Sequence, residues 1–223
     1  MSTRARFKDA PWFPGEEEIY CLVGGAGGIG SWLSFLLSRA GYLPFVFDFD
    51  EVEAHNIGGQ LFPQKAIGKK KVEALADLIN EFSIMEIDTY DEKYVEGSMT
   101  NEYVFAAFDN MQARKDMFKN WITHNKDNPN ALFIDGRLTM EQIQILCITP
   151  DQADEYEKEH LFDDSEVQEA PCTMKQTSHS AAMIASLMTG FFTNHITNVR
   201  EGKKVRQVPF FYEYFIPLNM VSK

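Results

Sequence analysis

The sequence predicts an α/β fold in which a doubly wound, mostly parallel sheet carries added antiparallel strands at its C-terminal side. Short apolar runs alternate with segments of helical period over the first 135 residues. The first of these runs leads directly into a glycine-rich turn. The chain has 223 residues, 44% of them hydrophobic and 13% aromatic, which is enough for a substantial core. This length favours one domain over residues 1–223, with residues 1–18 as a polar N-terminal arm.

The first predicted strand is the apolar run Ile19–Val23, which meets glycine at once. A helix is expected over SWLSFLLSRA, residues 31–40, with Gly41 as its stop signal. The run FVFDFD, residues 45–50, is typical of a short strand, and Lys70–Phe82 has helical period. Further expected elements are a strand over Tyr103–Phe108, a helix over Gln112–His124, strands over Ala131–Ile134 and Gln142–Thr149, a long helix over Thr177–Val199, and a last strand between Pro209 and Pro217.

One segment lacks a clear period. Asp151–Glu169 is acidic, and we expect a long loop, or a loop with one helical turn, within a crossover segment spanning residues 150–176. Loops of this length are uncommon in compact domains and are often functional. The alternative is a solvated acidic surface without a specific role.

Composition narrows the classes of function. The chain carries 21 Lys+Arg against 33 Asp+Glu, a formal charge of −12, which argues against a general nucleic-acid binder. The most apolar helical stretch, Ala181–Phe192, is too short to span a bilayer, and the polar N-terminus is unlike a signal peptide. We therefore expect a cytoplasmic protein without a membrane partner.

The three cysteines, Cys21, Cys147 and Cys172, form no Cys-x-x-Cys pair, so no zinc is expected. Cys21 and Cys147 lie in apolar strands and are expected in the core.

The strongest motif is the turn after the first strand, Gly24-Gly25-Ala26-Gly27-Gly28-Ile29-Gly30. Its Gly25, Gly27 and Gly30 fit the Gly-x-Gly-x-x-Gly spacing, and Gly24 and Gly28 loosen the turn further. Such a loop lets phosphate oxygens approach N–H groups at a helix N-terminus, as in Rossmann-like folds. Asp48 lies about 20 residues on, where an acid takes ribose hydroxyls. A dinucleotide, ATP or an empty tight turn are all compatible with this motif.

Further motifs follow in order. The stretch after Asp48 runs D-F-D-E-V-E-A-H-N-I-G-G-Q, and Gly68 is followed by Lys71-Val72. Asp109-Asn110 ends a buried strand, with Arg114 five residues beyond the aspartate. This set resembles the ThiF/MoeB/E1-like adenylyltransferase family, with its D-x-D-x-V-x-x-x-N-L-x-R-Q, G-x-x-K-V and D-N-x-x-x-R. The resemblance covers Ile19–Thr149 well and Pro171–His195 loosely.

The resemblance implies an ATP-dependent adenylyltransferase that activates the C-terminal carboxylate of a ubiquitin-like protein, a sulfur carrier or a peptide. It implies ATP and Mg²⁺ as cofactors and a homodimer or heterodimer as the assembly. Lys71 would contact the phosphates and Asp109 would hold the metal, while a solvated lysine and a helix-capping aspartate are the alternatives. The ribose would bind Asp48, and the same crevice would be lined by Asp50, Asn56 and Gln60. Cys172 would receive the acyl group, unless it is a half-buried structural cysteine, and Arg114 would pair with nearby acids.

Two departures from the family pattern leave other functions open. The family's arginine before the glutamine is replaced by Gly59, so that Lys65, Lys69, Arg4, Arg6 or a partner would have to supply the charge. The paired Cys-x-x-Cys motifs of many relatives are also absent. One alternative is therefore a catalytically weak or inactive nucleotide-binding subunit of a heteromeric complex. An NAD-dependent oxidoreductase is less favoured, because Lys71 and Asp109 have no evident role in hydride transfer.

Overall fold

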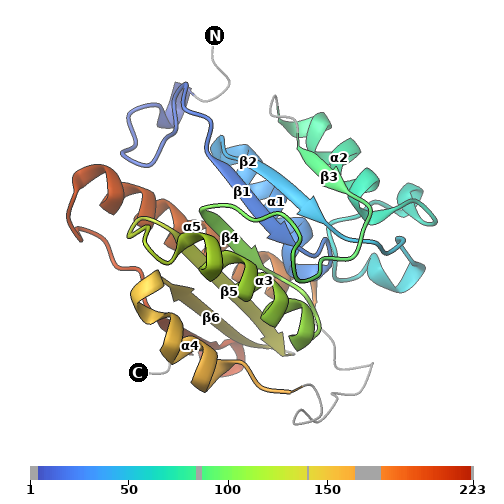
Figure 1. The fold of residues 1–223 in the computed structure, drawn as a ribbon. Coiled ribbons are helices and arrows are strands. Elements are labelled where there is room, and N and C mark those ends of the chain that lie inside the picture. Colours follow the sequence, from blue (N-terminus) through green and yellow to red (C-terminus); the bar gives the residue numbers. More distant parts are fainter. Residues whose placement is uncertain (1–4, 84–86, 140, 164–176, 222–223) are drawn as a thin grey trace.

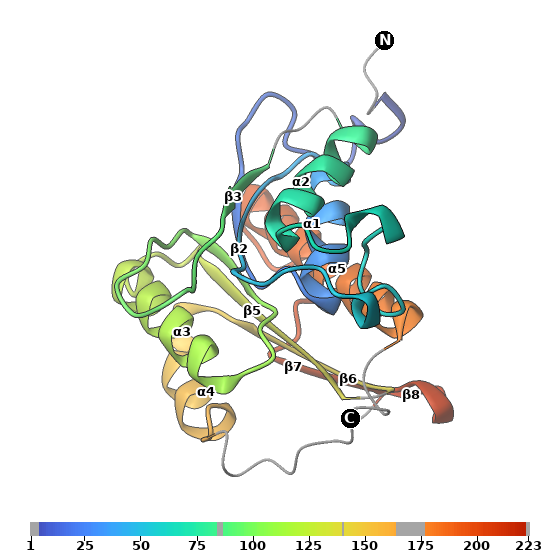
Figure 2. The same cartoon turned by 90° about the vertical axis from the view of Figure 1, so that its right-hand side faces the viewer.

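The computed structural model describes residues 5–83, 87–139, 141–163 and 177–221. Its strands form one eight-stranded sheet in the order β3-β2-β1-β4-β5-β6-β7-β8. Figure 1 labels β1 to β6, and Figure 2 labels β7 and β8 beside β6. The strands are β1 (Tyr20–Gly24), β2 (Leu43–Phe47), β3 (Asp88–Tyr90), β4 (Tyr103–Ala106), β5 (Leu132–Thr139), β6 (Gln142–Ile148), β7 (Phe211–Phe215) and β8 (Met220–Val221). β3, β2, β1, β4 and β5 pair in parallel, whereas β6, β7 and β8 add antiparallel. The predicted fold class is confirmed.

Helices cover both faces of the sheet. Figure 2 shows α1 (Gly28–Ala40), α2 (Lys71–Phe82) and α5 (Ser178–Glu201) on one side, and α3 (Met111–Asn125) and α4 (Ala153–His160) on the other. Gly41 ends α1 in the left-handed conformation, with φ of 104°, as the stop signal predicts. Among the described residues, no helix combines the length and apolar character that a membrane crossing requires.

Two cores result from the alternation of side chains along the strands. Cys21 and Val23 of β1 face the core shared with α1, α2 and α5, whereas Leu22 faces the core shared with α3 and α4. Such two-sided burial explains why β1 is apolar throughout. Cys147 is also 1% exposed, so both strand cysteines are core residues as predicted.

The acidic segment departs from the prediction. Residues 153–160, expected within a loop, form the regular helix α4. Thr149 and Gln152 form a capping box just before it, and Ala153 and Tyr156, three residues apart, are both buried against the sheet. Because acidic residues lie between them, this short apolar side gives no clear helical period in the sequence. Residues 164–176, the remainder of the predicted crossover loop, lie outside the described residues.

The N-terminal arm packs at the end of the sheet where β1 and β2 begin (Figure 1). The guanidinium of Arg200 on α5 donates to the carbonyls of Pro11 and Phe13, and the Tyr42 hydroxyl donates to the carbonyl of Trp12. A 3₁₀ turn over Ala5–Phe7 precedes these contacts. The arm is thus fixed at the amino edge of the parallel strands, away from their carboxyl ends.

Candidate functional site

The carboxyl ends of three neighbouring strands meet at one edge of the sheet. Gly24 at the end of β1 lies opposite Phe47 of β2 and Ala106 of β4. The N–H of Gly25 donates to the Phe47 carbonyl at 2.8 Å, and the Ala107 N–H donates to the Gly24 carbonyl at 2.9 Å. The strand order reverses between β1 and β4, and open α/β sheets bind ligands at the carboxyl side of such a switch point. The glycine loop therefore lies at the edge of the sheet where this fold class binds ligands.

Two positions of the glycine loop require glycine for physical reasons. Gly25 has φ of +93°, which strains any residue with a side chain. A Cβ atom on Gly30 would lie 1.7 Å from the Gly25 carbonyl oxygen, so this position requires glycine for close packing of α1. A Cβ on Gly27, the N-cap of α1, would meet only open space, and no described side chain caps the helix. The first N–H groups of α1 are thus positioned to meet an anion.

Asp48 ties the glycine loop to the end of β2. Its Oδ2 accepts the Ala26 N–H at 2.7 Å, and its Oδ1 accepts the Asp50 N–H at 2.9 Å. Burial raises the pKa of Asp48, while the positive charge of Lys71 and the two N–H donors oppose that rise. Each carboxylate oxygen has a second lone pair for a ribose hydroxyl. The geometry is compatible with the predicted ribose role and adds a structural role that the sequence did not indicate.

Lys71 is the first residue of α2 and is buried, with its side chain 9% exposed. Its Nζ lies 2.7 Å from Oδ2 of Asp50, whose side chain is 50% exposed. The alternative of a solvated lysine at a helix start is therefore wrong for Lys71. Its charge lies beside Asp48 and Asp50, at the edge of the sheet that also carries the glycine loop.

Asp109 follows β4 at the same edge and is exposed. Asn110, rather than Asp109, is the N-cap of α3: its Oδ1 accepts the Ala113 N–H at 2.8 Å. The alternative in which Asp109 caps the helix is thus wrong. A 3.4 Å contact with the Asn110 side-chain amide leaves most of its carboxylate available for a cation.

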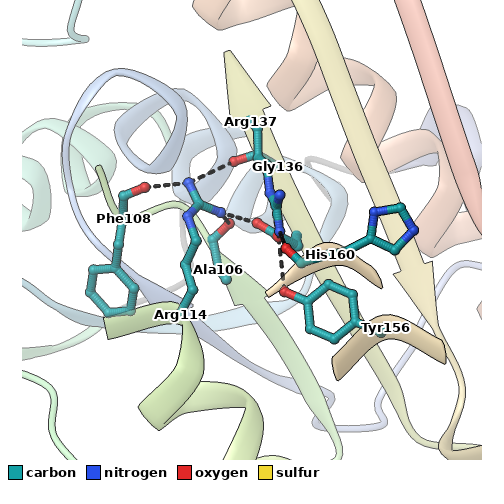
Figure 3. A network of polar contacts seen from close by, with 8 residues as sticks. Ala106, Phe108, Arg114, Gly136, Arg137, Tyr156 and His160 are labelled. Atoms are coloured by element: carbon teal, nitrogen blue, oxygen red, sulfur yellow. Dashed lines mark hydrogen bonds and ion pairs between the residues drawn. The ribbon is translucent and has the colours of Figure 1, made fainter. Parts of the chain in front are cut away.

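Arg114 on α3 fixes the backbone immediately before Asp109 (Figure 3). Its guanidinium donates to the carbonyls of Ala106, Phe108 and Gly136 and forms an ion pair with Asp135. Asp135 is 0% exposed. The prediction that Arg114 pairs with an acid is confirmed.

A second arginine completes this buried network. Nε and Nη2 of Arg137 lie 2.8 and 2.6 Å from Oδ2 of Asp135, and Tyr156 of α4 donates its hydroxyl to the same oxygen at 2.9 Å. Arg137 also donates to the His160 carbonyl at the end of α4, at 2.8 Å (Figure 3). Asp135, Arg137 and Tyr156 are not among the residues predicted from the sequence. The signal was present: a charged pair, Asp135 and Arg137, interrupts an otherwise apolar strand.

Two predicted crevice residues have other contacts. Oδ1 of Asn56 accepts the Glu53 N–H at 2.8 Å, and the Asn56 carbonyl accepts N–H groups of Gly59 and Gln60, so Asn56 organises its own turn. Gln60 lines a pocket of about 380 Å³ with Trp32 and other side chains of α1 and α2. In the part of the chain that is described, no hydrogen bond or ion pair joins either side chain to the glycine loop or to Lys71.

The positive residues proposed to replace the missing arginine are engaged elsewhere. Lys65 pairs with Glu81 at 3.3 Å, and Lys69 pairs with Asp77 at 2.9 Å. Both acids lie on α2, and all four side chains are exposed. Such exposed pairs are weak and are released at little cost. Arg6 lies in the 3₁₀ turn of the arm at the opposite edge of the sheet, and Arg4 lies outside the described residues.

Cys172 and its neighbour Lys175 also lie outside the described residues, so their predicted roles stay predictions. Within the described ranges, no group of three or more His, Cys, Asp or Glu side chains is placed to hold a metal by itself.

The chain matches the model of the ThiF family over residues 17–221. It is 30% identical over 110 residues to ubiquitin-like modifier-activating enzyme 5 of Caenorhabditis elegans, a match of 41% of this chain and 26% of that enzyme. The fold is similar to that of E. coli MccB, with a TM-score of 0.72 at 15% identity over 100% of this chain and 70% of MccB. It is also similar to E. coli TcdA, a tRNA N6-threonylcarbamoyladenosine dehydratase, with a TM-score of 0.61 at 18% identity over 92% of this chain and 97% of TcdA.

The chain thus spans about a quarter of the length of the curated enzyme it matches, and it covers 65% of PaaA, a further structure of similar fold. At such low sequence identities the solved structures establish the fold alone. The family model, in contrast, matches nearly the whole chain and includes the glycine loop, Lys71 and Asp109. This chain therefore belongs to the ThiF family.

Proposed function

We propose that this chain binds ATP at the carboxyl edge of its sheet and uses it to adenylate a C-terminal carboxylate. The observation that carries this proposal is the burial of Lys71 beside Asp50, at the edge that also holds the glycine loop and Asp48. Buried charges of this kind are costly and are concentrated at functional sites. A lysine ammonium suits a phosphate because it is a compact point charge.

Each part of the nucleotide has a matching group in this proposal. The N–H groups at the start of α1 receive phosphate oxygens, since no described side chain caps them. Asp48 accepts ribose hydroxyls through its remaining lone pairs, and Lys71 contacts the phosphates from the first turn of α2. NAD would use the first two features but not Lys71. This lysine is therefore the feature that favours ATP over an oxidoreductase cofactor.

In the proposed reaction, a carboxylate oxygen of the substrate attacks the α-phosphorus of ATP. The bond from that phosphorus to the bridging oxygen breaks, and pyrophosphate leaves with the electron pair, giving an acyl-adenylate. Because both reactants are anionic, the site must reduce their repulsion and hold them in line. Lys71 and the N-terminal end of α1 are proposed to reduce it.

The donor set at this edge fits Mg²⁺. Asp48, Asp50 and Asp109 follow strands that end at this edge of the sheet, and among the described residues Lys71 is the buried lysine, so a triphosphate there needs a further cation. Mg²⁺ prefers one or two carboxylates together with phosphate oxygens and water. Asp109 would hold it, since this carboxylate is exposed and does not cap α3. When bound, the ion would neutralise charge on the phosphates.

The proposed substrate is a ubiquitin-like protein, a sulfur carrier or a peptide with a free C-terminus. The sequence match to a ubiquitin-like modifier-activating enzyme supports the first of these. Structures of MccB, which has a similar fold, include one with ATP and others with MccA, and this supports a nucleotide and a second molecule as ligands of this chain. We further propose that the chain works as a homodimer or heterodimer, in which a partner supplies the charge that Gly59 lacks.

A later step is proposed for Cys172. Its thiolate would attack the acyl carbon of the adenylate, forming a thioester as AMP leaves. A Cys172→Ala variant should then still form the acyl-adenylate but yield no thiol-sensitive adduct with the substrate. A variant that retains this adduct would contradict the proposal for Cys172 alone.

The test of the main proposal is pyrophosphate–ATP exchange with Mg²⁺, using a panel of peptides that end in a free carboxylate. The same peptides with amidated C-termini are the matched control, because they lack the attacking oxygen. Exchange that requires the free carboxylate supports adenylation. ATP binding without exchange for any peptide or any co-expressed carrier would favour the alternative, an inactive nucleotide-binding subunit. Preferential binding of NAD over ATP would contradict both.

A further inference from the structure

Arg114 and Asp135 lie directly behind the carboxylate that the proposed function assigns to the metal. Asp135 on β5 is the register partner of Ala106, the last residue of β4. Two residues separate that strand end from Asp109. The guanidinium of Arg114 reaches back from the first turns of α3 to the carbonyls of Ala106 and Phe108. Hydrogen bonds from Arg114 to two of its carbonyls therefore fix the segment that leads to Asp109.

Phe108 is also held from the other side. Its ring packs so closely on the end of β1 that a Cβ on Gly24 would lie 2.4 Å from it. The Phe108 ring also lies 6.1 Å from that of Tyr94, measured between centroids. With its carbonyl bound by Arg114 and its ring packed on Gly24, Phe108 has little freedom. Asp109 follows it directly, so its position relative to the glycine loop is set by these contacts.

We propose that Arg114, held in place by the buried carboxylate of Asp135, is a positioning residue for Asp109 and so determines how strongly Mg²⁺ aids ATP binding. This inference rests on the proposed function. Arg114 has the geometry for it, because its planar guanidinium meets four acceptors at once, namely the Asp135 carboxylate and the carbonyls of Ala106, Phe108 and Gly136. An ammonium has three donors and no fixed fork. Groups that orient a metal ligand typically change metal affinity or activity about 10–100-fold when removed.

The chain supplies a matched control. Arg137 pairs with the other oxygen of the same Asp135, but its remaining hydrogen bond goes to His160 at the end of α4 rather than to Phe108. Arg114→Lys and Arg137→Lys both keep a positive charge next to Asp135. Only Arg114→Lys removes the fork that reaches Phe108. A role confined to stability would make the two variants alike.

The experiment measures the dissociation constant of ATP by calorimetry, once with excess Mg²⁺ and once with EDTA. The ratio of the EDTA value to the Mg²⁺ value is the metal advantage. Arg114→Lys is expected to reduce the metal advantage at least about 10-fold and to leave ATP binding in EDTA unchanged, whereas Arg137→Lys should leave both unchanged. In a double-mutant cycle, adding Arg114→Lys to Asp109→Asn should cause no further loss.

The outcomes separate this inference from the function beneath it. If Asp109→Asn leaves the metal advantage unchanged, the assignment of Asp109 in the proposed function fails. If Asp109→Asn lowers it and Arg114→Lys does not, the proposed function stands and the positioning role is overturned. Should Arg114→Lys fail to fold, Arg114→Gln combined with Asp135→Asn replaces the ion pair by amides and also lacks the fork. An unchanged metal advantage in that double variant would equally overturn the positioning role.

Discussion

The ammonium of Lys71 lies 2.7 Å from the carboxylate of Asp50, and this pair joins two motifs that are far apart in sequence. The N–H of Asp50 in turn donates to Asp48, which also accepts the Ala26 N–H of the glycine loop. One chain of contacts therefore runs from the start of α2 to the start of α1. Lys71 is oriented before any ligand binds, which lowers the entropy that binding must overcome.

The two glycines of the loop should respond differently to a methyl group. Gly30→Ala places a Cβ 1.7 Å from a backbone oxygen, so it should cost at least about 3 kcal/mol of unfolding free energy or prevent folding. Gly27→Ala meets open space and should cost less than about 1 kcal/mol. Urea unfolding of both variants checks this difference. Equal stability of the two would show that α1 packs less tightly on the loop than we describe.

His195 should make stability fall in mild acid. It is 7% exposed, its Nε2 lies 2.7 Å from the Asn130 carbonyl, and burial lowers its pKa, although that carbonyl and Glu102 oppose the change. The unfolded chain then takes up a proton below pH ~6.5 while the native chain does not. The unfolded state is therefore stabilised relative to the native state as pH falls.

Urea unfolding at pH 7.5 and 5.5 measures this effect. Between these pH values the unfolding free energy of the wild type should fall by up to about 1.4 kcal/mol more than that of His195→Gln. This is the most that one histidine with an ordinary unfolded pKa contributes over this interval. Glutamine keeps a donor for the Asn130 carbonyl and does not titrate. Comparing the two proteins cancels other titrations, including that of Asp48. Parallel pH dependences would contradict the account of His195.

Restoring the family's arginine should strengthen nucleotide binding. Gly59 is not among the described glycines with positive φ, so its backbone conformation does not by itself require glycine. Gly59→Arg should tighten ATP binding several-fold, with the gain shrinking as salt rises. Gly58→Arg is the control, because it adds the same charge one residue away with nothing within 4 Å of its Cβ. An equal gain from both variants would indicate a general charge effect rather than a specific phosphate contact.

Much of the fold could be predicted because each early strand is apolar throughout and the glycine turn marks the first crossover. The short strands β3 and β8, of three and two residues, are too brief to show any period. The helix α4 was missed since only Ala153 and Tyr156 of its eight residues are buried. The predicted strand over Ala131–Ile134 is shorter than β5, which continues through the charged residues Asp135 and Arg137 to Thr139, where the apolar run has ended.

The site was predictable to the extent that its residues lie in motifs. Gly25, Gly30, Asp48 and Lys71 are brought together as their spacing suggests. The Asp135 network was not predictable, because its members come from α3, β5 and α4 and only the folded chain places them around one carboxylate. Asn56 and Gln60 show that membership of a motif does not by itself place a residue at the site. Asn56 forms hydrogen bonds within its own turn, and Gln60 lines a pocket beside α1 and α2.

The most direct test of the central claim is the affinity for Mg·ATP of Lys71→Ala compared with Lys69→Ala. Both variants remove one positive charge near the start of α2, but Lys69 is 52% exposed and pairs with Asp77, whereas Lys71 is buried beside Asp50. We expect Lys71→Ala to weaken ATP binding at least about 10-fold, or 1.4 kcal/mol, and Lys69→Ala to leave it within about 2-fold of the wild type. Wild-type affinity in Lys71→Ala would contradict the proposed nucleotide site.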